Sequence, residues 1–316
     1  ADVSRPLTRP KGANAHMHYT NPPLENRIRS LASKMEPLPT GMPPRLRPLD
    51  DVRAVLFDIY GTLFISGSGD ISIASANHDG EALTAALGQI DAGGDLRTAG
   101  REGVLLLEET IRGLHEERRS QGVQSPEVDI LEVWRDVVED MCDEGIVELD
   151  ITEDKLEILA VEFECRVNPV WPMPGLGDLL AYFRETSVPL GIVSNAQFYT
   201  PLLFPALVGT SLDSLGFQAD LCSFSYRMLE AKPSVRLFEK PLQVLRDAYG
   251  IQAGETVYVG NDRLNDVYTA SLAGCRTVLF AGDRRSLRLR ENDPRCDGLQ
   301  ADAVITDLRQ LPDVLM

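Results

Sequence analysis

Short apolar runs that alternate with helical patterns constrain the fold of this chain more than any other feature. Four runs have the apolar, β-branched character of strands buried on both faces, namely 52–57, 188–193, 255–260 and 276–280. Two weaker candidates follow the same pattern in part, 220–225 and 301–306. Helical spacing lies between or after them, over 177–185, 234–249, 264–273 and 307–315. The alternation predicts a parallel sheet covered by helices on both faces.

About 130 residues between the first two strong runs have no strand character. Helical spacing recurs there over four segments, 81–90, 99–121, 126–143 and 152–167. The segment VNPVWPMPG, residues 167–175, ends this stretch, because its prolines stop helices and Gly175 permits a sharp turn. We therefore predict an all-helical insertion after the first strand, standing over one edge of the sheet.

The first fifty residues differ in composition from the rest of the chain. They contain nine of the 20 prolines and carry eight Lys+Arg against four Asp+Glu, so their charge is +4 and that of the remainder is −21. Helix-compatible spacing is confined to 24–36, and prolines bracket it. Such an extension cannot bury a core of its own. We expect it to lie along the acidic body or to move in solvent, and a docking arm for a partner or second subunit is the alternative.

The overall composition excludes several classes of protein. A net charge of −17 argues against a surface that binds nucleic acid through its phosphates. The five cysteines form no CxxC pair, and their odd number fits a reducing compartment. No apolar run approaches the roughly 20 residues of a membrane span, and the N-terminus shows no hydrophobic signal core. We expect a soluble, cytoplasmic protein with no membrane partner, and the sequence leaves monomer and homodimer open.

Polar residues follow each predicted strand at the end where parallel sheets bind ligands. The first strand ends at Asp58-Ile59-Tyr60-Gly61-Thr62, and the second ends at Ser194-Asn195. Lys232-Pro233 follows the weaker strand at 220–225, and Gly260-Asn261-Asp262 opens a segment that reaches Asp266. Any one of these groups alone is more often a helix cap or a turn. Their order, with a helical insertion after the first, is much more specific.

These motifs resemble those of the haloacid dehalogenase (HAD) superfamily with a helical cap inserted after the first motif. The four matching motifs are FDIYGTL (57–63), IVSNAQ (192–197), AKPSVRLFE (231–239) and VGNDRLND (259–266). The resemblance covers roughly residues 52–280 and implies an α/β fold, a three-layer sandwich with a parallel, Rossmann-like sheet plus an all-helical cap domain. We accordingly expect an N-terminal extension over 1–50, a core over 51–66 and 172–316, and a cap over 67–171.

The resemblance implies covalent catalysis by a carboxylate. Asp58 would attack the electrophilic atom of the substrate and form an ester or acyl-phosphate that water then hydrolyses. Thr62 and Ser194 would hold the transferring oxygens, with Asn195 beside them. Lys232 would neutralise the negative charge of nucleophile and substrate.

The resemblance also implies a magnesium site. Asp262 would ligate Mg²⁺ together with Asp58 and the backbone oxygen of Tyr60, and Asp266 would orient Lys232 or a metal-bound water. Charge supports this prediction, because three converging carboxylates have only Lys232 as a matched cation in the motifs. A hard divalent ion is the natural compensation for the remaining charge.

Two departures from the motifs point to different branches of the superfamily. Phosphatases place an acid/base Asp where this chain has Tyr60, and the dehalogenase branch has a Tyr there, as this chain does. A phenol is a poor base at neutral pH, and loss of a general acid/base costs about 10² to 10⁴ in rate. Conversely, the dehalogenase branch has uncharged Ser and Asn at the positions of Gly260 and Asp262, and a Tyr at the position of Phe238.

We therefore carry three hypotheses. The first is magnesium-dependent hydrolysis of a small phosphorylated metabolite, and the second is a 2-haloacid dehalogenase-type hydrolase that acts at carbon. The third is a binding or regulatory protein on a weakened catalytic site. The substrate is expected to be a small anionic molecule. Arginines of the predicted cap are candidates for holding its anionic group, namely Arg97, Arg101 and Arg112.

Overall fold

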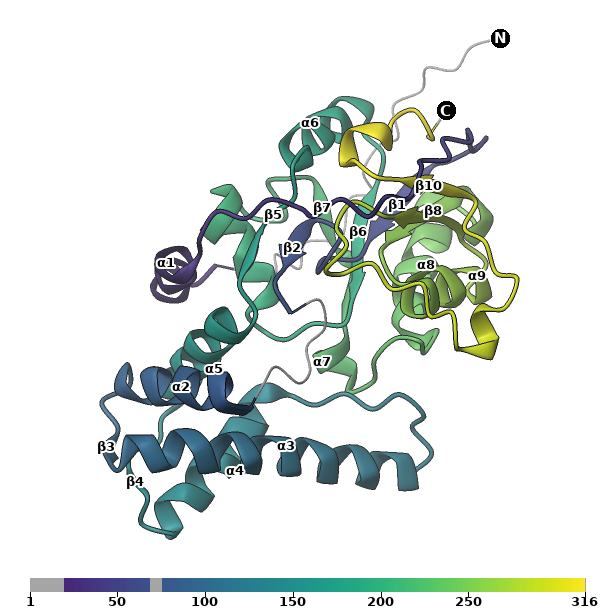
Figure 1. The fold of residues 1–316 in the computed structure, drawn as a ribbon. Coiled ribbons are helices and arrows are strands. Elements are labelled where there is room, and N and C mark those ends of the chain that lie inside the picture. The colour runs from purple at the N-terminus through teal and green to yellow at the C-terminus, as the bar shows by residue number, and fades with distance from the viewer. Residues whose placement is uncertain (1–19, 69–75, 316) are drawn as a thin grey trace.

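The computed structural model describes residues 20–68 and 76–315 (Figure 1). Its centre is a six-stranded sheet with the order β10-β9-β8-β1-β6-β7, in which all neighbouring strands are parallel. The strands are β1 (Ala54–Phe57), β6 (Leu190–Ser194), β7 (Phe217–Phe224), β8 (Thr256–Gly260), β9 (Arg276–Phe280) and β10 (Ala303–Ile305). The four strong and two weak strand predictions are thus all confirmed.

Alternate residues of β1 show why this sheet is covered on both faces. Val55 and Phe57 belong to one apolar core together with α6 (Leu176–Thr186), and the Phe57 ring meets that of Phe183 edge to face at 5.9 Å. Ala54 and Leu56 belong to a second core together with α8 (Arg236–Tyr249) and α9 (Thr269–Leu272). Successive side chains of a strand point to opposite faces of the sheet, and both faces are covered here. Every residue of β1 is therefore buried. The molecule is a three-layer α/β sandwich.

In the part of the cap that the structure describes, four helices are inserted between two short strands. These strands, β2 (Phe64–Ser66) and β5 (Val170–Pro172), pair antiparallel where the chain leaves and re-enters the core. Between them lie α2 (Ala76–Gly88), α3 (Leu96–Ser120), α4 (Ile130–Asp143) and α5 (Glu153–Val167), with a second pair of strands, β3 (Gly93–Gly94) and β4 (Val147–Glu148). Asp95, Asp129 and Thr152 accept backbone hydrogen bonds as N-caps of α3, α4 and α5. Figure 1 shows these helices as a group below the sheet.

Residues 20–50 lie against the rest of the molecule. Helix α1 (Pro22–Leu31) buries Leu24 and Ile28, four residues apart on one face, against α5 and the π-helical segment η2 (Phe204–Val208). Arg27 forms an ion pair of 2.6 Å with Glu162 of the cap. Farther on, the backbone of Arg45 exchanges two hydrogen bonds with Val304 of β10. The segment buries its apolar face in the core of the body, because it has too few apolar residues for a core of its own.

Three helix predictions need correction. The expected last helix, 307–315, is only a 3₁₀ turn, η6 (Leu308–Gln310), and Pro312 follows closely. The expected helix at 264–273 is divided into a π-helical segment, η4 (Arg263–Tyr268), and α9. Helix α1 ends at Leu31 rather than at residue 36. The remaining short elements are α7 (Ser225–Met228), η1 (Thr200–Leu202), η3 (Ala253–Glu255) and η5 (Pro294–Cys296).

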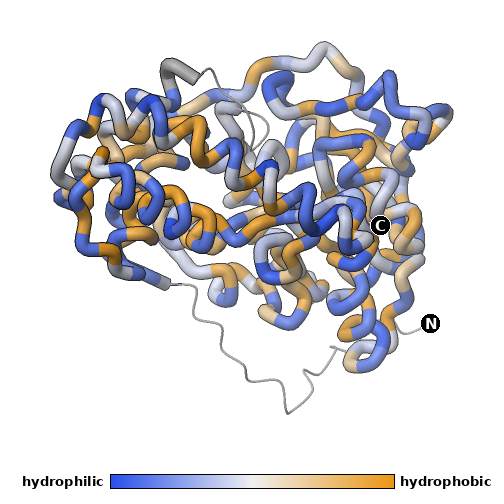
Figure 2. The backbone as a smooth tube through the Cα atoms, turned by 90° about the horizontal axis from the view of Figure 1, so that it is seen from below, coloured by the Kyte–Doolittle hydropathy of each residue, from blue (hydrophilic) through white to orange (hydrophobic). Residues whose placement is uncertain are grey.

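Hydrophobic and hydrophilic residues are interspersed along the chain when it is viewed from the cap side (Figure 2). In the part of the chain that the structure describes, no helix combines the length and the apolar character needed to cross a membrane. All five cysteines have free thiols.

Candidate active site

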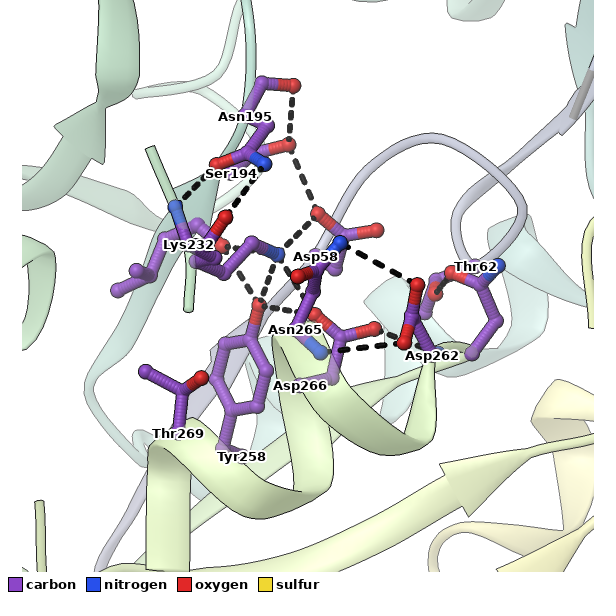
Figure 3. Close-up of polar contacts among 12 residues, drawn as sticks. Asp58, Thr62, Ser194, Asn195, Lys232, Tyr258, Asp262, Asn265, Asp266 and Thr269 are labelled. Carbon is purple, nitrogen blue, oxygen red and sulfur yellow. Dashed lines mark hydrogen bonds and ion pairs between the residues drawn. The ribbon is translucent and has the colours of Figure 1, made fainter. Parts of the chain in front are cut away.

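The predicted site residues come together at the carboxyl ends of adjacent strands. Asp58 directly follows β1, Ser194 ends β6, and Asp262 follows β8 after one residue. Lys232 lies beyond β7 and the short helix α7 and reaches in from the side (Figure 3). Because β1 lies between β6 and β8, the three strand ends place their side chains around Asp58.

Asp58 is held through one of its two carboxylate oxygens. Its Oδ1 accepts hydrogen bonds from Ser194 Oγ and Lys232 Nζ, both at 2.8 Å. None of the described residues donates to Oδ2, although the side chain is nearly buried. The carboxylate is therefore oriented and charge-compensated while one oxygen stays uncommitted, which is the arrangement that a nucleophile needs.

Lys232 joins Asp58 to Asp266. Its Nζ donates to Asp266 Oδ1 at 2.6 Å and to the hydroxyl of Tyr258 at 2.8 Å. Burial alone would lower the pKa of Lys232, but the charges of Asp266 and Asp58 outweigh it and the pKa is raised. Lys232 is thus an ammonium ion, and Asn195 fixes its backbone by accepting its N–H at 2.8 Å.

Tyr258 is a site residue that the sequence analysis missed. It lies within β8, where the run TVYVG looks like an ordinary buried strand. Its hydroxyl accepts from Lys232, donates to the carbonyl of Val193 at 2.6 Å and lies 3.2 Å from Asp266 Oδ1. Its ring packs edge to face on Phe238 at 4.9 Å. The available signal was the phenol itself, because a buried tyrosine hydroxyl requires a polar partner.

Asp266 uses both carboxylate oxygens within the wall of the site. Oδ1 accepts from Lys232, and Oδ2 accepts the backbone N–H of Asp262 at 2.8 Å. Burial raises the pKa of Asp266 to about 6, an effect that Lys232 opposes and the charges of Asp58 and Asp262 reinforce. A Cβ atom at Gly260 would lie 2.3 Å from Asp266 Cγ, so only glycine fits there while Asp266 keeps this position.

Asp262 is paired with an arginine that the sequence analysis did not consider. Arg290 Nε lies 3.1 and 3.0 Å from the two carboxylate oxygens, and Nη2 forms an ion pair with Oδ2. The same carboxylate caps η4 by accepting the N–H groups of Leu264 and Asn265. The charge balance inferred from the sequence therefore omitted a cation, because Arg290 lies outside the four motifs.

The residues expected around magnesium come together at the site, but protein donors engage most of their carboxylate oxygens. Among the described residues, no three His, Cys, Asp or Glu side chains form a group that could hold a metal. Both carboxylate oxygens of Asp262 and of Asp266 accept hydrogen bonds, whereas Oδ2 of Asp58 accepts none from the described residues. Mg²⁺ usually keeps several of its waters and takes one or two carboxylates, so the pairing of Asp262 with Arg290 is the feature that does not suit the ion.

Tyr60 and Thr62 follow Asp58 closely in the chain, and their hydroxyl groups bond to residues other than Asp58. The Tyr60 hydroxyl is 3.0 Å from Thr200 Oγ1, and burial, with the nearby charge of Glu164, raises the pKa of Tyr60 well above its usual value. The phenolate that could act as a base is thus still scarcer at neutral pH than the residue type suggests. Thr62 donates to Asn261 Oδ1 at 3.1 Å and so supports the loop that carries the fourth motif.

A cavity of about 160 Å³ opens beside Asp58. Of the predicted site residues, those in its wall are Asp58, Tyr60, Asn195, Lys232, Asp262 and Asp266. Thr62 and Ser194 are buried behind them. The wall also contains two charged residues that the sequence analysis did not single out, Glu127 and Arg288.

A larger cavity of about 590 Å³ lies between cap and core and is lined mainly by apolar side chains such as Leu107, Trp134 and Phe163. It shares Glu127 and Gln197 with the smaller cavity. Arg112 lines this larger cavity, whereas Arg97 and Arg101 line neither of the two.

Comparison with known proteins identifies the family of the chain. Residues 52–274 match the family model described as haloacid dehalogenase-like hydrolase. The chain belongs to this family. No curated protein matched it.

Solved structures of the family share the fold. A 2-haloacid dehalogenase from Pseudomonas syringae pv. Tomato DC3000 is 21% identical, with a TM-score of 0.52 over 83% of this chain and 97% of the other. An L-2-haloacid dehalogenase from Xanthobacter autotrophicus is 18% identical, with a TM-score of 0.44 over 83% and 97%. A predicted phosphoglycolate phosphatase from Haemophilus somnus 129PT is 18% identical, with a TM-score of 0.43 over 84% and 99%. At these identities the likeness concerns the fold alone.

Proposed function

We propose that this member of the haloacid dehalogenase-like hydrolase family displaces a leaving group such as halide from carbon in a small 2-substituted carboxylic acid. The observation that carries the proposal is the pairing of Asp262 with Arg290. Asp58, Asp262 and Asp266 each bring a carboxylate to the site. With Asp262 paired, Asp58 is the one whose Oδ2 accepts no hydrogen bond from the described residues. That oxygen is the nucleophile, and Lys232 holds the other.

The chemistry proceeds in two steps. Asp58 Oδ2 forms a bond to the substrate carbon, and halide leaves with the electron pair of the broken carbon–halogen bond. Water then attacks Cγ of the resulting ester and releases the hydroxy acid. Lys232 and Ser194 donate to Oδ1, where negative charge develops as water adds to the ester carbonyl.

Arg288 is the residue we assign to the anionic group of the substrate. It lines the nucleophile's cavity because residues 261–263 and 288 exchange backbone hydrogen bonds, which bring its segment alongside Asp262. The three cap arginines inferred from the sequence do not reach this cavity. A guanidinium group suits a carboxylate because it can donate two parallel hydrogen bonds.

The competing function is magnesium-dependent hydrolysis of a phosphate ester. Asp262 lines the same cavity as Asp58, which favours it, but Arg290 would first have to leave Asp262. A binding or regulatory role on the same fold is the third alternative.

The deciding experiment measures halide release from 2-chloropropionate and related haloacids without added metal, beside phosphate release from small phosphate esters with Mg²⁺. We expect halide release that Asp58→Asn reduces to background. A single turnover in ¹⁸O-water should place the label in the Asp58 carboxyl group, because water attacks Cγ. Magnesium-dependent phosphate release would overturn the proposal in favour of the phosphatase, and absence of turnover on both panels would favour a binding role.

Arg288→Gln tests the assignment of the anion-binding residue. Loss of a charged hydrogen bond to the substrate should raise KM roughly 10- to 100-fold with a smaller change in kcat. Arg284→Gln is the matched control, since Arg284 is exposed on the same segment and lies outside this cavity. Equal KM values for both variants would show that Arg288 does not hold the substrate.

A further inference from the structure

Glu127 lies on the loop between α3 and α4, and this loop is attached to the core. Its backbone N–H donates to the carbonyl of Leu229 at 3.1 Å, and Ala231 N–H donates to the carbonyl of Ser125 at 2.7 Å. Pro126 and Glu230 form an antiparallel bridge between these bonds. Residues 229–231 directly precede Lys232, so this pairing fixes the position of Glu127 relative to the site lysine.

The carboxylate of Glu127 is held only by neutral donors. Ser225 Oγ donates to Oε2 at 2.8 Å, and Val128 N–H donates to Oε1 at 3.0 Å. The Gln197 amide is 3.5 Å from Oε1. No described lysine, arginine or histidine forms an ion pair with it. Keeping a desolvated carboxyl group ionised without a nearby cation costs free energy, so such a group accepts a proton more readily than a solvated one.

Glu127 differs in this respect from the other carboxylates in the wall of the nucleophile's cavity. Asp58 and Asp266 are paired with Lys232, and Asp262 is paired with Arg290. Tyr60, at the position of the phosphatase acid/base, stays a neutral phenol at neutral pH, and its hydroxyl is hydrogen-bonded to Thr200. Among the described residues of this wall, Glu127 is therefore the group best suited to accept a proton.

Burial also raises the pKa of Glu127, and the hydrogen bonds from Val128 and Ser225 offset this only in part. A carboxyl group in this state binds a proton more readily than an exposed glutamate does. It is thereby better matched to proton transfer near neutral pH.

We propose that Glu127 is the proton acceptor for the water that hydrolyses the Asp58 ester, an inference that rests on the proposed function. Water oxygen bonds to Cγ of the ester while one water proton passes to Glu127. The bond between Cγ and the former Oδ2, which is now bonded to the substrate carbon, then breaks; its electron pair leaves with the alkoxide, and Glu127 returns the proton to that alkoxide. The second water proton leaves the regenerated Asp58 to solvent.

The test separates the two chemical steps in the full-length protein. A single turnover of Glu127→Gln on the best haloacid should form the Asp58 ester at a rate within about twofold of wild type. Its hydrolysis should slow by about 10² to 10⁴, which is the usual contribution of a general base. Intact-protein mass spectrometry then detects the ester as an added mass. Glu132→Gln, an exposed glutamate in the first turn of α4, is the matched control and should hydrolyse the ester normally.

Chemical rescue distinguishes a proton acceptor from a structural residue. Formate should restore part of the ester hydrolysis in Glu127→Ala, because a small carboxylate can occupy the vacated space, and it should not accelerate wild type. Unchanged ester hydrolysis in Glu127→Gln would overturn the inference, and so would an equal loss of both chemical steps without rescue by formate. In either case an Asp58 ester detected in the wild type would still support the proposed function. Absence of any Asp58 ester in wild type and Glu127→Gln would overturn both.

Discussion

Asp262 and Asp266 lie on the same turn, four residues apart, yet their surroundings differ. Asp266 pairs with Lys232, and both side chains are 2% exposed. Asp262 pairs with Arg290, whose side chain is 31% exposed. The inner pair is shielded from water and linked to the nucleophile, whereas the outer pair lies at the mouth of the site. Water cannot solvate the charges of the inner pair, so each charge depends on the other for stabilisation. In the outer pair the arginine is partly solvated, and another cation could take its place beside Asp262.

The inner pair should respond most strongly to loss of its cation. Lys232→Met leaves Asp58 and Asp266 buried without a counter-ion, so we expect the free energy of unfolding to fall by about 3–5 kcal/mol at pH 7 and turnover to be lost. Urea denaturation and the haloacid assay measure the two effects. Lys240→Met is the control, because Lys240 is 61% exposed and 3.9 Å from Asp220. Similar, small losses of stability in both variants would show that the buried lysine stabilises the fold no more than an exposed one does.

Asp266→Asn should change how stability depends on pH. Because the pKa of Asp266 in the folded protein is about 6, above its usual value of 3.8, the folded state binds this proton more tightly than the unfolded state. This group therefore makes wild-type stability decline as pH rises from about 4 to 6, by on the order of 3 kcal/mol or less. The asparagine side chain cannot ionise, so the variant should lack that decline. Urea denaturation at several pH values compares the two proteins, and parallel curves would contradict the raised pKa.

The outer pair should contribute least to stability. Arg290→Gln should change the free energy of unfolding by about 1 kcal/mol or less, because the arginine is partly solvated. The same variant should bind Mg²⁺ more tightly than wild type in a calorimetric titration, since the Asp262 carboxylate is released. Arg295→Gln, in which an arginine is removed from its pair with Asp293, is the control. Tighter magnesium binding by wild type than by Arg290→Gln would instead support the phosphatase alternative.

The residues that the sequence located correctly share a simple positional rule. Asp58, Ser194 and Asp262 follow buried parallel strands, so the periodicity that reveals the strands also places these side chains at one edge of the sheet. The helical insertion could be recognised in the same way, since two of its helices, α3 and α4, each have an apolar face. These features depend on spacing within short segments, and such spacing is visible in the sequence.

Tertiary structure alone decided the rest of the site. Arg290 reaches Asp262 from 28 residues farther along the chain, through a loop without regular spacing. Tyr258 is a buried strand residue, and its part in the site is visible only once the fold places Lys232 beside its hydroxyl. Glu127 enters the wall of the nucleophile's cavity because a cap loop pairs with the segment before Lys232. By itself the sequence determined the sheet, the helical insertion and the positions of Asp58 and Lys232 after their strands, because local patterning dictates them. The charge partners and the proposed proton acceptor were decided by contacts between segments whose approach no local pattern encodes.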